Sequence, residues 1–168
     1  MKVCRVRGVI FDRDDTLTVD VGFTYKLDDL SLLPGVRETM AFLSKHRLPI
    51  GIATNQSGIG EGHYKFYDMY LFNRALSMLI SDITGYSPDF AICSHRIASP
   101  PICGCRKPQP TLLLHICKSW NIDPTECLFV GDSATDEQAA KKLNMPFYKC
   151  SPHQDRTNFF TEIKTRIL

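Results

Sequence analysis

The sequence lacks any apolar run that approaches the roughly 20 residues a membrane-spanning helix needs. Its basic start is followed by only a short apolar run that ends at the acidic segment 12–15, so we expect no signal peptide. It also lacks an excess of one charge, because 20 basic and 18 acidic residues give a net charge of +2. Binding to membranes or nucleic acid through bulk electrostatics therefore has weak support. We expect a cytoplasmic protein.

Internal repeats, low-complexity tracts and linkers are absent as well. The chain has 168 residues, of which 43% are hydrophobic, and this is enough to bury one sizeable core. We therefore expect a single domain over residues 1–168. The expected oligomeric state is a monomer.

Five short apolar runs are separated by segments of helical periodicity. The runs lie at residues 6–11, 49–53, 90–93, 127–130 and 147–150. Most are continuous rather than alternating, as strands buried on both faces are. Helical patterns begin after residue 35 and span about 64–83, 111–120 and 135–143. The second carries a periodic apolar set at Phe66, Met69, Tyr70, Phe72, Leu76, Leu79 and Ile80. This alternation predicts an α/β protein in three layers, a parallel sheet with helices on both faces.

Polar and ionisable residues follow four of the five expected strands, in segments 12–16, 54–58, 103–108 and 131–136. In a parallel sheet, ligands bind beyond the carboxyl ends of the strands. Each segment alone is typical of a solvated loop or a turn, but that interpretation does not explain their joint placement. Several carboxylates at one sheet edge would repel each other, so a cation is expected between them. A nearby lysine and hydroxyl would suit a phosphoryl group.

In this order the four segments resemble the motifs of haloacid-dehalogenase-type phosphatases. The matching residues are Asp12, Asp14 and Thr16, then Thr54 and Asn55, then Lys107 before a proline, then Asp132 and Asp136. The pattern is most similar to the branch that contains histidinol-phosphate phosphatase and D-glycero-D-manno-heptose 1,7-bisphosphate phosphatase. Segments 19–23 and 33–36 look more like the heptose enzymes, and the resemblance covers roughly residues 6–150. It implies a Rossmann-like fold of the haloacid-dehalogenase type, and because the segments after each motif are short, we expect the fold to be capless.

The resemblance also implies a hydrolase mechanism. Asp12 would attack phosphorus to form an aspartyl-phosphate, and Asp14 would act as general acid and then as general base. Thr54 and Lys107 would bind the phosphoryl oxygens. The cofactor Mg²⁺ would bind Asp12, Asp132 and the backbone carbonyl of Asp14. We expect the substrate to be a small phosphorylated metabolite.

Three further positions receive roles from their place in these motifs. Asp136 would orient Lys107 or a water on the metal, and Asn55 would fix the second-motif turn or contact substrate. Arg106 precedes Lys107, and we expect its guanidinium to reach over the substrate toward a second phosphate or sugar hydroxyls. The alternative is that Arg106 pairs with a surface carboxylate such as Glu61.

One residue departs from the family's pattern, because Asp15 stands where the related phosphatases usually have glycine. Aspartate tolerates the left-handed backbone conformation better than most residues, so we expect the turn to survive. A third carboxylate beside the metal would nevertheless lower the affinity for substrate.

Seven cysteines are a high count for a cytosolic chain, and an odd number does not suit a framework of disulfides alone. Cys93, His95, Cys103 and Cys105 supply three thiolates and one imidazole, the closed ligand set of a structural Zn²⁺ site. Disulfides or free thiols are the alternative, although cytosolic disulfides are rare. The resembling enzymes carry a similar loop. The remaining cysteines, Cys4, Cys117, Cys127 and Cys150, are expected to be small core residues.

Several functions remain open. The first is hydrolysis of a sugar phosphate, with the heptose 1,7-bisphosphate as the best candidate and with specificity determined by residues 17–33 and the zinc loop. The second is hydrolysis of histidinol phosphate, and the third is a nucleic-acid 3′-phosphatase, against which no basic patch with interleaved aromatics is visible. A phosphate-binding module without turnover is the fourth. Retention of both Asp12 and Asp14 argues against it, because a binder needs no acid or base.

Overall fold

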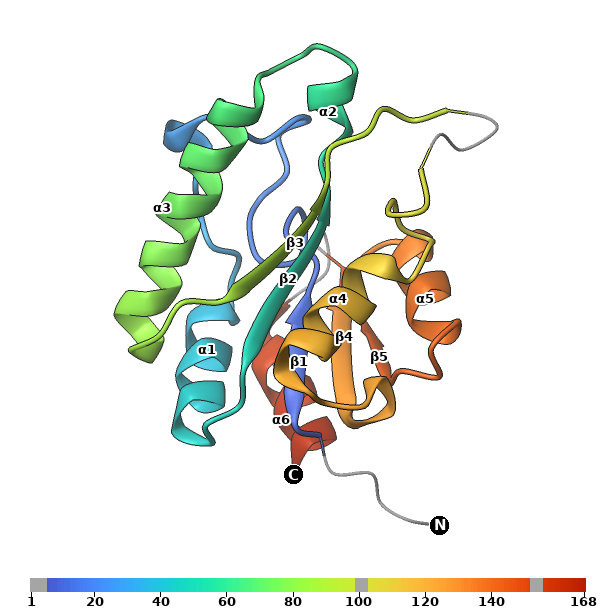
Figure 1. Cartoon of the computed structure of the whole chain (residues 1–168). Coiled ribbons are helices and arrows are strands. Elements are labelled where there is room, and N and C mark those ends of the chain that lie inside the picture. The colour runs from blue at the N-terminus through green and yellow to red at the C-terminus, as the bar shows by residue number, and fades with distance from the viewer. Residues whose placement is uncertain (1–5, 99–102, 152–155) are drawn as a thin grey trace.

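The computed structural model describes residues 6–98, 103–151 and 156–168, and a five-stranded parallel sheet forms its centre (Figure 1). The strands are β1 (Gly8–Phe11), β2 (Ile50–Asn55), β3 (Asp89–Cys93), β4 (Cys127–Gly131) and β5 (Phe147–Lys149). They lie in the order β3-β2-β1-β4-β5, and each neighbouring pair is parallel. The predicted sheet is confirmed, with strand ends that differ from the expected ones by one or two residues.

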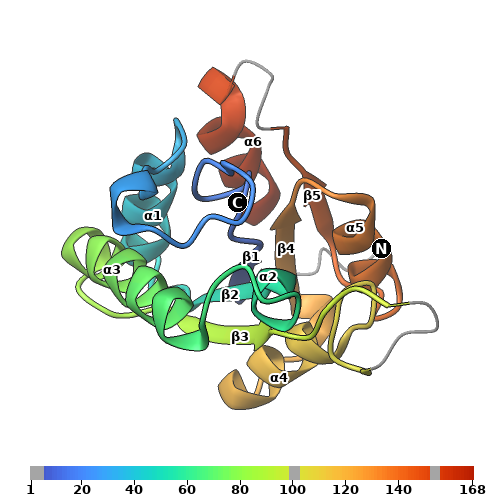
Figure 2. The same ribbon diagram turned by 90° about the horizontal axis from the view of Figure 1, so that it is seen from above.

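Helices cover both faces of the sheet, so the predicted three layers are confirmed (Figure 2). One face carries α1 (Val36–Lys45), α3 (Phe66–Thr84) and α6 (Phe159–Ile167), and the other carries α4 (Thr111–Trp120) and α5 (Ala134–Lys141). The periodicity predicted α1, α3, α4 and α5. It missed α6 and the single turn α2 (Ser57–Gly60), which follows β2.

The continuous apolar runs follow from the position of the strands between two cores. In β1, Val9 and Phe11 belong to the core under α1, whereas Ile10 belongs to the core under α4. All three are fully buried. Because successive side chains of a strand point to opposite faces, a strand covered on both sides needs an apolar residue at every position.

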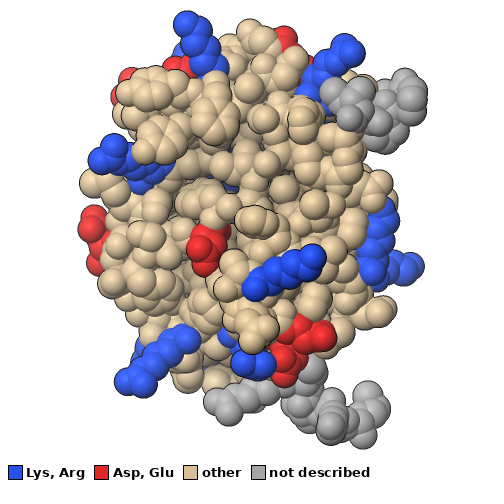
Figure 3. All heavy atoms as spheres, in the orientation of Figure 1, with Lys and Arg blue, Asp and Glu red and all other residues tan. Residues whose placement is uncertain are grey.

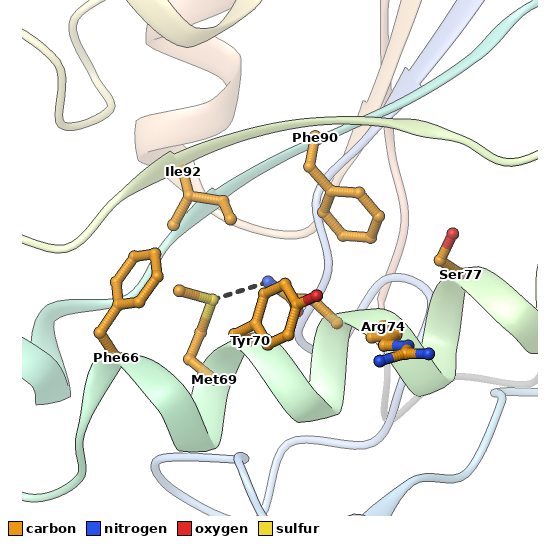
Figure 4. A pocket seen from close by; sticks show the side chains of 8 residues that line it. Phe66, Met69, Tyr70, Arg74, Ser77, Phe90 and Ile92 are labelled. Carbon is orange, nitrogen blue, oxygen red and sulfur yellow. Dashed lines mark hydrogen bonds between the residues drawn. The ribbon is translucent and has the colours of Figure 1, made fainter.

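The apolar face of α3 corrects one expectation. Met69 and Phe72 are buried as its spacing predicts, but Phe66 and Tyr70 are 59% and 47% exposed. The reason is that β3 is the edge strand, so among the described residues no further strand covers this flank of the helix. Phe66, Tyr70 and Phe90 instead border a hollow of about 300 Å³ between α3 and β3 (Figure 4).

Between β1 and α1 the only helical element is a 3₁₀ turn, and between β2 and α3 it is α2, so the described residues include no separate cap domain. Cys117, Cys127 and Cys150 are buried, as expected of small core residues, and Cys4 lies outside the described residues. No helix within the described ranges is long and apolar enough to span a bilayer.

Candidate active site

Lys107 and the aspartates of the first and fourth motifs meet at the carboxyl end of the sheet. Asp12 directly follows β1, and Lys107 lies between β3 and α4. The Lys107 side chain is 2% exposed, and its Nζ lies 2.6 Å from Asp12 Oδ1 and 2.7 Å from Asp136 Oδ1. Nζ also donates to the carbonyl of Ala53 at 2.8 Å. The ammonium therefore bridges two buried carboxylates, which supports the interpretation that Asp136 orients Lys107.

The first turn of α5 places Asp136 beneath the site. Ser133 is the N-cap, and its Oγ accepts from the Asp136 amide at 3.2 Å while the Ser133 amide donates to Asp136 Oδ2 at 3.1 Å. This reciprocal capping box leaves Oδ1 of Asp136 for Lys107. Gly131 makes the close packing possible, because a Cβ there would lie 2.7 Å from Asp136 Oδ2.

Carboxylates crowd together beside this lysine. Oxygen atoms of Asp12, Asp132 and Asp136 all lie within 4.8 Å of one another. Burial raises the pKa of Asp12 to about 8, against the opposing charge of Lys107. Burial also raises the pKa of Asp132 to about 6, with smaller contributions from Asp136 and Asp15. Clustered carboxylate oxygens are the ligands that Mg²⁺ prefers, so the residues present fit this cation.

The side chain of Asp14 lies outside this cluster and is held by other groups. Arg13 donates to both of its carboxylate oxygens, at 2.9 Å and 3.0 Å, and Gln56 Nε2 donates to Oδ2 at 2.7 Å. Burial raises the pKa of Asp14, whereas the Arg13 guanidinium lowers it. The motif analysis assigned no role to Arg13 or Gln56. The signal that could have found them is their position inside the first and second motifs.

The two residues that end β2 have different tasks. Asn55 Nδ2 donates to the carbonyl of Lys107 at 3.1 Å, and the amide of Lys107 donates to Asn55 Oδ1 at 3.0 Å. Asn55 thus fixes the backbone that carries the lysine, a role that the motif analysis did not assign to it. Thr54 is buried, and its Oγ1 accepts a hydrogen bond from Gln56 Nε2 at 2.9 Å.

The turn after the nucleophile strand keeps its shape with aspartate in it. Asp15 has φ of 57°, in the left-handed region, so the expected tolerance of aspartate is confirmed. Its Oδ1 accepts a hydrogen bond from the amide of Asp20 at 3.1 Å. A second anchor of this turn, Arg156, was missed, and its Nη2 donates to the carbonyl of Thr16 at 2.8 Å.

The four expected zinc ligands form a second cluster at the end of β3. The Sγ atoms of Cys93, Cys103 and Cys105 and Nδ1 of His95 lie within 4.8 Å of one another, and no disulfide joins the three cysteines. Cys93 Sγ lies 3.7 Å from Cys103 Sγ, and His95 Nδ1 lies 3.2 Å from Cys105 Sγ. Tetrahedral ligands about 2.3 Å from zinc would be separated by roughly 3.8 Å. The separations in this cluster lie at or below that spacing, down to 3.1 Å between Cys93 Sγ and Cys105 Sγ, so the four donors are grouped closely enough to suit Zn²⁺. Gly60 lets α2 approach this loop, because a Cβ there would overlap the backbone of Arg96.

Arg106 lines a hollow of about 360 Å³ together with Arg96 and Lys107. Its Nη1 is buried and has no hydrogen-bond partner among the described residues. The proposed ion pair with Glu61 is wrong, because Glu61 Oε1 accepts from the amide of Ile97 and Oε2 lies 3.7 Å from His63. Another hollow of about 300 Å³ is lined by Asp14, Phe23, Asn55 and Tyr64, among other residues.

The face of the molecule shown in Figure 3 carries charged side chains of both signs. On the face shown in Figure 3, the described Lys and Arg side chains are scattered between acidic and uncharged ones and form no continuous basic surface.

The sequence and the structure of this chain are similar to those of known hydrolases. The haloacid dehalogenase-like hydrolase family matches residues 21–144. The chain is 31% identical to D-glycero-beta-D-manno-heptose-1,7-bisphosphate 7-phosphatase of Photorhabdus laumondii, over 80% of this chain and 74% of that protein. It is 32% identical to the protein of the same name from Pseudomonas aeruginosa, over 81% and 76%. The structure of D,D-heptose 1,7-bisphosphate phosphatase from B. bronchiseptica, complexed with magnesium and phosphate, superposes with a TM-score of 0.76 at 26% identity, covering 84% of this chain and 79% of that one.

Proposed function

Because the chain belongs to the haloacid dehalogenase-like hydrolase family and is a phosphatase of that family, we propose that it hydrolyses a sugar bisphosphate, with D-glycero-D-manno-heptose 1,7-bisphosphate as the specific candidate. The observation that carries the proposal is the bridge from Lys107 to Asp12 and Asp136 beside clustered carboxylates. It combines a nucleophile, a cation site and a phosphoryl-binding ammonium. We further propose that residues 1–168 form one domain.

In the first half-reaction, a carboxylate oxygen of Asp12 attacks phosphorus while the bond from phosphorus to the sugar oxygen breaks. Asp14 gives a proton to the leaving alkoxide, and the product is an alcohol and an aspartyl-phosphate. Lys107 and Thr54 bind the phosphoryl oxygens during the transfer. Lys107 needs no reorganisation for this task, because Asp136 and the Ala53 carbonyl already hold its ammonium.

In the second half-reaction, water attacks the phosphorus of the aspartyl-phosphate while Asp14 removes its proton. The bond to Asp12 breaks, and inorganic phosphate leaves. Mg²⁺ bound by Asp12, Asp132 and the backbone carbonyl of Asp14 would supply positive charge to the phosphoryl oxygens. Splitting one displacement into two lets the same pair of aspartates serve both steps.

A bisphosphate is favoured by the cations around Arg106. Arg96 and Arg106 line one hollow together with Lys107, so two basic residues beyond the phosphoryl-binding lysine border this space. The unpartnered Nη1 of Arg106 would donate a hydrogen bond to a second phosphate. The relatives named above act on a sugar with two phosphates, in agreement with this arrangement.

The substrate is tested by measuring phosphate release, with Mg²⁺, from three compounds: the heptose 1,7-bisphosphate, histidinol phosphate and a 3′-phosphorylated oligonucleotide. We expect the highest kcat/KM with the bisphosphate. Faster release from either of the other two would replace the proposed substrate, and no release from any of them would contradict the proposed activity.

We predict one zinc ion per chain. The thiolates and imidazole of the Cys93 cluster are grouped at ligand distance, so protein purified without added zinc should contain close to one equivalent by elemental analysis. Cys103→Ala should lose most of this metal. Cys117→Ala removes a buried thiol outside the cluster and is the matched control. Absence of zinc from freshly reduced wild-type protein would contradict the site.

Asp15→Gly should preserve kcat/KM or raise it by a few fold. Glycine adopts the left-handed φ of 57° without strain, and the substitution removes a charge that contributes to raising the pKa of Asp132. Asp15→Asn separates these effects, because asparagine removes the charge but keeps a side chain that tolerates this backbone conformation. Steady-state kinetics would measure both variants. A large loss of kcat/KM in Asp15→Gly would instead assign Asp15 a role of its own.

A further inference from the structure

Arg13 stands between the two catalytic aspartates in the sequence, and its side chain is fully buried. Its guanidinium binds Asp14 along one edge, with Nε 2.9 Å from Oδ1 and Nη2 3.0 Å from Oδ2. The flat face of the guanidinium lies over the ring of Phe72, 4.7 Å from the centroid. Two parallel hydrogen bonds from a planar donor define the plane of the carboxylate as well as its position.

Three separate segments hold the guanidinium in turn. Nη1 donates to Asn73 Oδ1 at 2.9 Å, and Nη2 donates to the carbonyl of Thr24 at 2.6 Å and to Gln56 Oε1 at 3.0 Å. Asn73 is itself fixed within α3, because its Nδ2 lies 2.8 Å from the sulfur of Met69, the contact dashed in Figure 4. Arg13 is therefore tied to α3, to the loop after β1 and to the loop after β2.

The same contacts reach the hollow beside Asp14. Thr24 and Gln56 line it together with Asp14 and Tyr64. Gln56 donates to Asp14 Oδ2 at 2.7 Å and accepts from the Tyr64 hydroxyl at 2.6 Å. The Arg13 guanidinium thus contacts Asp14 and two other residues, Thr24 and Gln56, that line this hollow. The alcohol part of a substrate would lie in it.

We infer that Arg13 is a positioning residue for departure of the leaving group, holding Asp14 toward this hollow, and that Asn73 of α3 anchors Arg13. The inference rests on the proposed function, because it concerns the proton that Asp14 gives to the alkoxide. It assigns no contact between Arg13 and substrate. The expected signature is a change in how strongly the rate depends on the leaving group.

The test compares kcat/KM for a primary sugar phosphate and for para-nitrophenyl phosphate in wild type and Arg13→Met. An alkoxide needs the proton to leave, whereas a nitrophenolate leaves readily without it. Because kcat/KM contains only the steps up to release of the alcohol, hydrolysis of the aspartyl-phosphate does not enter the comparison. General acid catalysis contributes roughly 10²–10⁴-fold, so partial loss of alignment should cost the sugar phosphate at least tenfold more than the aryl phosphate.

Two variants distinguish positioning from general support of the fold. Asn73→Ala removes the anchor without touching Asp14 and should shift the ratio of the two kcat/KM values in the same direction, by a smaller factor. Arg166→Met is the matched control, since Arg166 of α6 also lies over an aromatic ring, that of Tyr148 at 4.4 Å, and pairs with a carboxylate, that of Glu162 at 2.7 Å, but has no part in the site. Its ratio should equal that of wild type, and Arg13→Lys should recover part of the wild-type ratio.

A crystal structure of Arg13→Met supplies a readout that does not need turnover. Displacement of the Asp14 carboxylate supports the inference, and an unchanged carboxylate overturns it. Equal losses for both substrates in folded Arg13→Met would also overturn it while leaving the proposed function in place. If wild type released phosphate from neither compound, the proposed function would fail, and the crystal structure would still decide whether Arg13 positions Asp14. Should Arg13→Met not fold, the same measurements on Asn73→Ala decide the question.

Discussion

Asp12→Asn should reduce phosphate release by roughly a thousandfold or more, because removal of a nucleophile abolishes the covalent route. An amide nitrogen or oxygen cannot replace the carboxylate in attack on phosphorus. The substitution also removes a negative ligand from the cluster with Asp132 and Asp136, so the affinity for Mg²⁺ should fall as well. Phosphate release at saturating Mg²⁺ separates the first effect from the second.

The fold should survive this substitution. Asp12 is buried beside Lys107, but the ammonium keeps its contacts with Asp136 and the Ala53 carbonyl. Circular dichroism and thermal unfolding would verify this. Asp82→Asn makes the same chemical change at an exposed position in α3, outside the site, and should retain full activity. Retention of more than a few per cent of wild-type turnover by Asp12→Asn would remove the nucleophile assignment.

The helices and strands were predictable where the apolar residues within the element itself showed a strand or helix pattern. The continuous run that contains Val9 and Phe11 required a strand covered on both faces, and this is where β1 lies. The strand order carries no such local signal. Exposure of Phe66 and Tyr70 depends on β3 being at the edge of the sheet, which their spacing along α3 cannot reveal. The missed helix α6 did have a signal, since Phe159 and Ile163 are both buried and four residues apart.

The site divides in the same way. Residues inside motifs were predictable, and in the structure Lys107 contacts both Asp12 and Asp136 although the three lie far apart in the sequence. Residues outside the motifs that hydrogen-bond to them from other elements were not predictable. Asn73 contacts Arg13 only because α3 packs over the sheet, and no spacing within α3 distinguishes it from a core asparagine. Buried polar partners of this kind follow from tertiary packing.

Arg106→Ala should lower kcat/KM for the sugar bisphosphate by roughly ten- to a hundredfold, and that for para-nitrophenyl phosphate much less. Charge-assisted hydrogen bonds to a buried group contribute about 1.5–3 kcal/mol, which corresponds to this factor. The structure supplies a reason for the difference between substrates. Nη1 of Arg106 is buried without a partner among the described residues, so it has a hydrogen bond to offer a second phosphate. An aryl phosphate has no second phosphate to accept this hydrogen bond.

The position of Arg106 in the chain should enlarge this effect. Cys105 precedes it and belongs to the expected zinc cluster, while Lys107 follows it and is held through its backbone by Asn55. A side chain fixed between two anchored neighbours loses little conformational entropy on binding, so more of the contact energy reaches the complex. Arg74→Ala removes an exposed arginine beside the hollow at α3 and is the control for a general loss of positive charge. Zinc content should equal that of wild type in both variants, which verifies that the loop is intact. If the two substrates lost equal factors in Arg106→Ala, the guanidinium would act on the transferred phosphoryl group, and its role in selecting a bisphosphate would be wrong.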